Sequence, residues 1–337
     1  MSRTIVYVAC AESHEIVVLR LDRESGALEP VQRVATGGRV MPLALSHDRR
    51  FLYASIRSAP LAVLSFAIDP ASGTLAPLGT SPLPASMCWI GLDRSGRWLL
   101  SSSYGENVVA VNPIGDDGVA GAARQTLGTA PNAHSIQTDP SNRLAFAACL
   151  GGDVVCAFSF DESSGTLEPI PEPAWRTRAG AGPRHFAFHP SAPFVYLLNE
   201  LDATVDALEH PAGATRFGHV QTIAAMPHGA VGKPWAAEIR FRPDGRFLYA
   251  SERRTSTLTT FAVDPKGGWL TLVGHSATAS EPRGFAIDPS GRWLLAAGQA
   301  SHRLRVHAID ADGGALMEHA EHEVGLEPNW VEIVALG

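Results

Sequence analysis

The stretch FAIDPSGRWLL, from Phe285 to Leu295, contains the pattern on which the fold prediction rests. In it, an alternating apolar segment leads to a polar residue, a short turn and a second apolar segment. Related stretches recur as LALSHDRRFLY, WIGLDRSGRWLL, IQTDPSNRLAF, FAFHPSAPFVY and IRFRPDGRFLY. Their aligned polar column advances by 47, 46, 50, 53 and 46 residues, falling at Ser46, Asp93, Asp139, His189, Arg242 and Asp288. A regular period of this length indicates a repeat architecture.

Each repeat divides into about four short alternating runs separated by turn residues. In the last complete repeat the runs are RGFAID, RWLLAAG, RLRVHAID and ALMEHAEHEV. Runs of this kind, with no convincing helix between them, are typical of antiparallel sheets. Four strands in a unit of about 45 to 50 residues predict an all-β fold, the β-propeller.

The two ends of the chain together make one further repeat. The chain begins with TIVYVAC, EIVVLRLD and ALEPVQRVA, which match the second, third and fourth strands of a unit. It ends with GLEPNWVEIVALG, which matches a first strand. We therefore expect residues 1–337 to form one domain, a seven-bladed propeller with four antiparallel strands per blade. Pairing of the C-terminal strand with the N-terminal blade would close the ring and cover its open edge.

Composition narrows the class of partner. The net charge of -7 argues against nucleic acid or an anionic membrane surface, since both select a basic protein. No apolar run approaches the ~18 residues that span a membrane, and the N-terminus lacks an apolar segment of signal-peptide length. The four cysteines show no CxxC spacing and are expected to be reduced thiols. We expect a soluble, cytoplasmic monomer or small homo-oligomer with neither a nucleic-acid nor a membrane partner.

The repeat register selects a candidate site. In a propeller the first strand of each blade lines the central channel, and the loop before it opens on the same face as the loop between the second and third strands. Five residues before the polar column, the first strands carry Met41, Cys88, His134, Arg184, Ala237, Arg283 and Asn329. The second-to-third-strand loops carry residues 12–14, Arg57, residues 104–107, residues 199–200, residues 252–253 and residues 299–302. We expect both sets to meet at one end of the channel.

The residue types in this set favour an anionic ligand. Buried arginines are costly unless an anion pairs with them, whereas single polar groups can simply satisfy nearby backbone or a buried water. The set has few carboxylates, so we expect no metal, and no sequence motif indicates a cofactor. GxSxG and HExxH motifs are absent. Four other histidines are expected to be structural or exposed: His185, His189, His319 and His322.

The chain resembles the seven-bladed propeller lactonase family, which includes bacterial 6-phosphogluconolactonases and fungal carboxy-cis,cis-muconate cyclases. The resemblance covers essentially the full length and is closest in NAHS, GAGPRHFAFHP, LNEL, PWAAEIRFRPDGRFLYA, EPRGFAIDPSGRWLLAAGQASH and GLEPNWV. In that family the proposed active site is a metal-free cluster of His, Arg, Glu and Arg. By motif these correspond here to His134, Arg184, Glu200 and Arg283. The repeat register selects three of the four independently.

The resemblance implies hydrolysis of a small anionic lactone, with 6-phosphogluconolactone favoured, and needs no cofactor. His134 and Glu200 would exchange protons with the attacking water and the leaving ring oxygen. Arg184 and Arg283 would bind the anionic group and stabilise the oxyanion. The other expected substrate contacts are Arg57, Tyr104, Arg253, Gln299, His302 and Asn329.

Two other functions and another substrate class fit parts of the pattern. The same four residues could catalyse cycloisomerisation of a muconate-type dicarboxylate. A non-catalytic propeller could bind a peptide, but that predicts exposed aromatic residues at the channel end, where the loops offer only Tyr104. Lysines expected from the resemblance near Gly151 and Ala300 are missing. Their absence makes an unphosphorylated or carboxylated lactone an alternative substrate.

Overall fold

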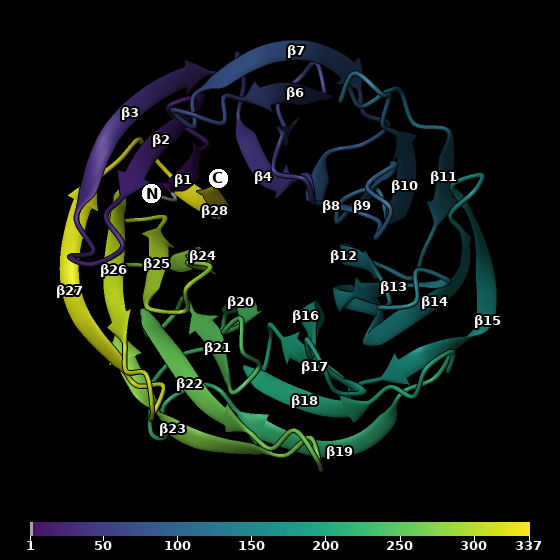
Figure 1. The fold of residues 1–337 in the computed structure, drawn as a ribbon. Coiled ribbons are helices and arrows are strands. Elements are labelled where there is room, and N and C mark those ends of the chain that lie inside the picture. Colours follow the sequence, from purple (N-terminus) through teal and green to yellow (C-terminus); the bar gives the residue numbers. More distant parts are fainter. Residues whose placement is uncertain (1–2) are drawn as a thin grey trace.

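The computed structural model describes residues 3–337. Its strands form seven four-stranded antiparallel sheets, the blades, arranged in a ring (Figure 1). The first strand of each blade lies innermost and the fourth lies at the rim. The predicted seven-bladed propeller is confirmed.

The blades are numbered here in chain order. Blade 1 contains β28 (Pro328–Leu336), β1 (Arg3–Cys10), β2 (Glu15–Leu21) and β3 (Leu28–Ala35). Blade 2 contains β4 (Val40–Leu45), β5 (Phe51–Ile56), β6 (Ala62–Ile68) and β7 (Leu75–Pro82). Blade 3 contains β8 (Met87–Leu92), β9 (Trp98–Ser103), β10 (Val108–Pro113) and β11 (Gln125–Gly128). Blade 4 contains β12 (Ala133–Thr138), β13 (Leu144–Cys149), β14 (Val154–Asp161) and β15 (Thr166–Arg176), with a 3₁₀ turn, η1, at Leu150–Gly152.

The remaining three blades follow the same order. Blade 5 contains β16 (Pro183–Phe188), β17 (Phe194–Asn199), β18 (Thr204–Glu209) and β19 (Gly218–Ala224). Blade 6 contains β20 (Ala236–Phe241), β21 (Phe247–Glu252), β22 (Thr257–Val263) and β23 (Leu270–Ala277). Blade 7 contains β24 (Pro282–Ile287), β25 (Trp293–Gly298), β26 (Arg303–Ile309) and β27 (Leu316–Glu323).

The ring is closed by strands from opposite ends of the chain. β28 pairs antiparallel with β1, and Ala9 lies opposite Trp330. Figure 1 shows the purple N-terminal and yellow C-terminal strands side by side in blade 1. Because β1 is paired on both sides, neither of its edges is left open. This is the predicted closure.

The turn that defines the repeat is held by its aspartate. In blade 7 one carboxylate oxygen of Asp288 accepts the backbone N–H of Trp293 at 2.8 Å, and the other accepts that of Ser290 at 3.0 Å. Gly291 completes the turn with a φ of 71°, a conformation that favours glycine. The DPSG sequence therefore fixes how β24 turns into β25.

Neighbouring blades are joined by apolar packing and by buried tyrosine hydroxyls. The apolar faces of the sheets pack against one another, as in the cluster that includes Ile5, Leu43 and Phe66. The hydroxyl of Tyr249 in blade 6 donates to the carbonyl of Gly314 in blade 7 at 2.8 Å. Tyr7 and Tyr196 make the same contact with the blade that follows theirs. None of the helices among residues 3–337 is long and apolar enough to cross a membrane.

Candidate functional site

Every innermost strand is interrupted near its start by a β-bulge, and the residue column selected from the sequence falls at the bulge. In blade 4, Ala133 lies opposite Cys149 and Ser135 lies opposite Ala148, so His134 is the extra residue. Bulges redirect side chains relative to the regular alternation of a strand. The bulged positions are Cys88, His134, Arg184, Arg283 and Asn329, and in blades 2 and 6 the residue pairs 41–42 and 237–238.

Glu200, just after β17, is the acidic centre of the site. Its Oε2 lies 2.7 Å from Nε of Arg184 and 2.9 Å from an Nη of Arg253. Both arginine side chains are only 2% exposed, and that of Glu200 is 13% exposed. Both guanidiniums approach Oε2, and Oε1 makes no hydrogen bond among residues 3–337. A carboxylate oxygen in this state is available to a water or a substrate hydroxyl.

The two arginines are fixed by further contacts. Arg184 donates to the carbonyl of Ala237 in blade 6 and contacts the ring of His185. Arg253 donates to the carbonyl of Trp235 at 3.1 Å, and its guanidinium lies 3.9 Å from the centre of the Trp235 ring. These contacts join blade 5 to blade 6 and hold the Glu200 carboxylate in place.

His134 is a buried, neutral imidazole beside this ion cluster. Burial, together with the charges of Arg184, His185 and Arg283, holds its pKa well below the usual value. Its Nδ1 is buried without a hydrogen-bond partner. Its ring lies edge-on to His185, with the ring centres 5.1 Å apart, and to the partly exposed Tyr104 at 5.9 Å. The lowered pKa agrees with the expectation for a histidine among arginines.

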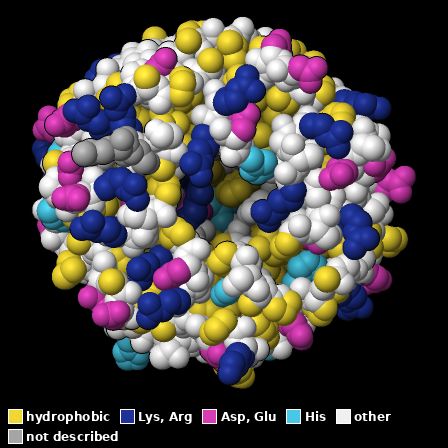
Figure 2. Space-filling view, in the orientation of Figure 1, with side chains coloured by type: hydrophobic (Ala, Val, Ile, Leu, Met, Phe, Trp, Pro, Cys, Tyr) yellow, Lys and Arg dark blue, Asp and Glu magenta, His cyan; other side chains and the backbone are white. Residues whose placement is uncertain are grey.

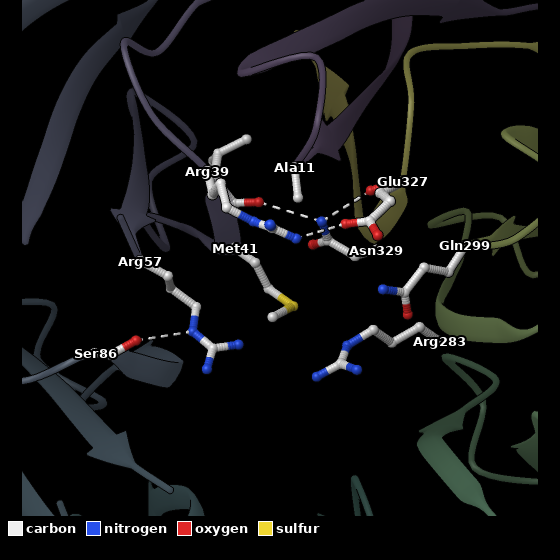
Figure 3. A pocket seen from close by; sticks show the side chains of 10 residues that line it. Ala11, Arg39, Met41, Arg57, Ser86, Arg283, Gln299, Glu327 and Asn329 are labelled. Atoms are coloured by element: carbon white, nitrogen blue, oxygen red, sulfur yellow. Dashed lines mark hydrogen bonds and ion pairs between the residues drawn. The ribbon is translucent and has the colours of Figure 1, made fainter. Parts of the chain in front are cut away.

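A cavity of about 400 Å³ lies at this end of the channel, which we call the mouth. It is lined by residues from blades 1, 2 and 7 and by Ser86, which precedes β8. In Figure 3 the guanidiniums of Arg57 and Arg283 point toward one another from opposite sides of this cavity. Gln299 and Asn329, both predicted substrate contacts, also line it. Figure 2 shows the other face of the ring, which is also hollowed at its centre, with Lys or Arg side chains on the sides of the hollow and a histidine within it.

The cavity combines two unpaired arginines with unpaired amide oxygens. Nε of Arg57 donates to the Ser86 hydroxyl at 3.2 Å. Arg283 has no side-chain hydrogen bond or ion pair among the described residues, and burial and the charges of Arg184 and Arg57 lower its pKa to about 10. The amide oxygens of Gln299 and Asn329 are buried without partners. Such a surface suits a ligand that carries both an anion and hydroxyl groups.

Two of the residues selected from the sequence have side chains with contacts of their own. His302 is exposed and is not among the residues that line the cavity; its Nδ1 accepts the backbone N–H of Glu327 at 3.1 Å. Arg184 is engaged by Glu200 and by backbone, so it is less free to clamp a ligand than Arg283. At Gly151, the position of one missing lysine, a Cβ would lie 2.1 Å from Oδ1 of Asn132, so a side chain there would require the Asn132 amide to move.

Charged residues deeper in the channel were not singled out from the sequence. His185 Nδ1 lies 3.1 Å from Glu238, and Arg240 lies between Glu238 and Glu332 at 3.7 and 3.4 Å. Burial raises the pKa of Glu238 and of Glu332. Arg240 and Glu332 occupy the third position after the bulge in their strands. A comparison of this position across the aligned repeats would have shown both charged residues from the sequence.

The other histidines and the cysteines have environments that fit a structural role. His189 is buried and accepts two backbone N–H groups at its turn, whereas His319 and His322 lie on the outer strand β27. All four cysteines are free thiols. Among residues 3–337, no group of three or more His, Cys, Asp or Glu side chains is arranged to hold a metal ion.

Comparison with known proteins gives one consistent result. The family described as "Lactonase, 7-bladed beta-propeller" matches residues 5–333. A 6-phosphogluconolactonase of Serratia proteamaculans is 42% identical over 333 residues, which cover 99% of each chain. One of Pectobacterium carotovorum is 41% identical over 332 residues, 98% of this chain and 99% of the relative. A solved periplasmic gluconolactonase of Pseudomonas aeruginosa, PpgL, is 30% identical with a TM-score of 0.92, over 99% of this chain and 100% of that one.

Proposed function

The chain belongs to the seven-bladed β-propeller lactonase family, and we propose that it is a lactonase that hydrolyses 6-phosphogluconolactone to 6-phosphogluconate. Relatives named for this activity match almost the whole chain. The structural neighbour PpgL is named a gluconolactonase, a name that refers to an unphosphorylated lactone. The choice between these lactones therefore depends on the charges at the mouth.

The observation that carries the proposal is the buried, neutral His134 next to the arginines Arg184 and Arg253, which hold the carboxylate of Glu200. A neutral imidazole can accept a proton from water as that water attacks the lactone carbonyl. Once protonated among arginines it is a strong acid, because the same charges that lower its pKa favour proton release. It then returns the proton to the ring oxygen as the C–O bond breaks. One residue can thus serve both half-reactions.

Glu200 and the arginines complete the proposed mechanism. Oε1 of Glu200 accepts a hydrogen bond from the attacking water and orients it. The buried charges of Arg184 and Arg253 act on the same region, since both lower the pKa of His134. Positive charge fixed in advance where an oxyanion develops is a large catalytic contribution. Arg283, which has no acidic partner within residues 3–337, holds the anionic group of the substrate.

The proposal includes the setting of the reaction. The enzyme acts without a metal or organic cofactor, because its proton-transfer groups and positive charges are all side chains. We place it in the cytoplasm, as a monomer or small homo-oligomer, with no nucleic-acid or membrane partner. Four free thiols and a phosphorylated sugar substrate fit a reducing intracellular setting.

Proton release tests the proposed activity directly, because opening a lactone at neutral pH yields a carboxylic acid that ionises. 6-Phosphogluconolactone and gluconolactone are followed with a pH indicator, with spontaneous hydrolysis subtracted. We expect strong acceleration of the phosphorylated lactone and a loss of roughly 100-fold or more in His134→Ala. A wild-type rate equal to the spontaneous rate for both lactones would refute the proposed function.

A further inference from the structure

The inference concerns how the site distinguishes a phosphorylated substrate, and it rests on the proposed function. We propose that Arg57 and Arg283 form a subsite for a phosphate dianion, and that Arg57 determines the preference for a phosphorylated over an unphosphorylated sugar lactone. The subsite lies in the cavity between blades 2 and 7, beside the catalytic cluster of blades 4 to 6.

The ion pairs at the mouth show which charges remain available. Arg39 is paired with Glu12 and with Glu327 at distances of 2.5 and 2.9 Å. Arg184 and Arg253 share Glu200. Within the described chain, Arg57 and Arg283 have no acidic partner. The charged residues that line the cavity are three arginines and one glutamate, Glu327, which is paired with Arg39. Two positive charges are therefore left over, those of Arg57 and Arg283.

The geometry allows one group to contact both arginines. The two guanidiniums face each other across the cavity (Figure 3) and are close enough for Arg57 to lower the pKa of Arg283. Two like charges in this position repel until an anion lies between them. Each planar guanidinium can donate two parallel hydrogen bonds to phosphate oxygens. The Ser86 hydroxyl, which accepts from Arg57, can donate its own hydrogen to the same group.

The amount of charge favours phosphate over carboxylate. A phosphate monoester carries about -1.5 to -2 charges at pH 7, whereas a carboxylate carries one. A dianion therefore balances both free guanidiniums, and a neutral lactone balances neither. Without a balancing ligand the two arginines remain desolvated and unpaired, a costly arrangement. The excess of two charges is the structural reason to expect a phosphosugar.

The neighbouring amides orient the sugar between the two sites. Nδ2 of Asn329 donates to the carbonyls of Val40 and Glu327, at 3.2 and 3.1 Å. Its Oδ1 is therefore fixed as an unpaired acceptor, which suits a hydroxyl and repels a phosphate oxygen. Arg283 lies near both Arg57 and Glu200, since the charges of both shift its pKa. A substrate with its phosphate at Arg57 can thus direct its lactone ring toward Glu200.

The subsite also explains how the chain can act without the lysines that the family resemblance suggested. At Gly151 the Asn132 amide occupies the space that a Cβ would take, and Ala300 is exposed. The paired arginines supply the charge from another pair of blades. This makes the presence of Arg57 a feature to test in its own right.

The test compares kcat/KM for 6-phosphogluconolactone and gluconolactone in the wild type, Arg57→Gln, Arg57→Lys and Arg39→Gln. Arg39→Gln is the matched control: it removes the same charge from the same cavity, but from an arginine already paired with two glutamates. We expect the ratio of the two values to fall roughly 10- to 100-fold in Arg57→Gln, the usual scale for a hydrogen bond to a charged group. It should fall less in Arg57→Lys and stay within about threefold of wild type in Arg39→Gln.

Equal losses on both lactones in Arg57→Gln, or an equal fall in the ratio in Arg39→Gln, would overturn the subsite while leaving lactone hydrolysis intact. Titration with inorganic phosphate, measured by calorimetry on the same proteins, decides the matter independently of turnover. We expect phosphate binding in the wild type to weaken at least 10-fold in Arg57→Gln. Should the wild type hydrolyse neither lactone, the proposed function fails, and unchanged phosphate binding in Arg57→Gln would then refute the subsite as well.

Discussion

Replacing Glu200 by glutamine should reduce both stability and turnover, and the size of the stability loss follows from the structure. Glu200 is the acidic partner of Arg184 and Arg253, which are almost fully buried. Removing one partner of a buried ion pair costs about 3 to 5 kcal/mol, because the remaining charge is left uncompensated. The glutamine amide oxygen can still accept one hydrogen bond, so we expect about 3 kcal/mol.

This free energy converts into a measurable melting temperature. An unfolding entropy of about 2.1 cal/mol/K per residue gives roughly 0.7 kcal/mol/K for a chain of this length, so Tm should fall by about 4 °C. Turnover should fall roughly 100-fold or more, since the water is no longer oriented. The position of Glu200 in a loop would suggest little effect on folding. The two ion pairs are the reason to expect a loss of stability.

His134→Gln is the matched control for this prediction. It removes a buried group of the same site, but one that is neutral and whose Nδ1 has no hydrogen bond to lose. Its turnover should fall as far as that of Glu200→Gln, with a change in Tm of no more than about 1 to 2 °C. Calorimetry and the proton-release assay on both variants give the four values needed. Equal melting temperatures for wild type and Glu200→Gln would show that the ion pairs contribute nothing to stability, and near-normal rates in both variants would refute the site.

Five further predictions concern the site and the closure of the ring. As the pH is lowered, the rate of hydrolysis of the uncharged lactone should begin to fall only below pH 6.5, because the lowered pKa keeps His134 neutral down to that pH. A rate that already falls above pH 6.5 would contradict this. The free energy of unfolding should fall as pH drops below 6.5, since the unfolded chain then binds protons that the buried His134 and His185 do not; a stability independent of pH between 5 and 7 would count against it. Deleting the residues after Glu327 removes β28 and should abolish the native melting transition. A truncated chain that melts at the same temperature as the full chain would contradict this. Arg283→Lys should reduce kcat/KM for 6-phosphogluconolactone far more than for gluconolactone; equal losses on both lactones would contradict this. A chelator should leave the wild-type rates on both lactones unchanged; activity that is lost with the chelator and restored by added zinc or calcium would contradict this.

The sequence predicted the fold because the information is repeated. The aspartate turn occurs in several blades, and an incomplete repeat at each end of the chain required a closing strand. The candidate site followed from the same register, since His134, Arg184 and Arg283 share one column. What the column did not reveal is its physical cause, a β-bulge at that point in every innermost strand.

The pairing of charges could not be predicted, because it depends on distances between blades. Whether Glu200 neutralises Arg184 or Arg283 decides which arginine is free for a ligand, and the sequence is silent on this point. Glu238 was missed for a related reason: it follows an alanine in an apolar strand, with no motif to distinguish it. His302 shares a loop with Gln299, yet the two side chains have different surroundings, which loop membership alone does not reveal.

The closure of blade 1 has a consequence for how the protein is made. β1 leaves the ribosome among the first residues, but its inner partner β28 is among the last. At typical synthesis rates of 5 to 20 residues per second, the two are separated by roughly 15 to 65 seconds. During that time an apolar strand, IVYVA, has one unpaired edge, whereas each of the other six blades is complete once its own four consecutive strands have been made. The nascent chain is therefore most exposed to aggregation in blade 1, and this hazard ends only when β28 has been made.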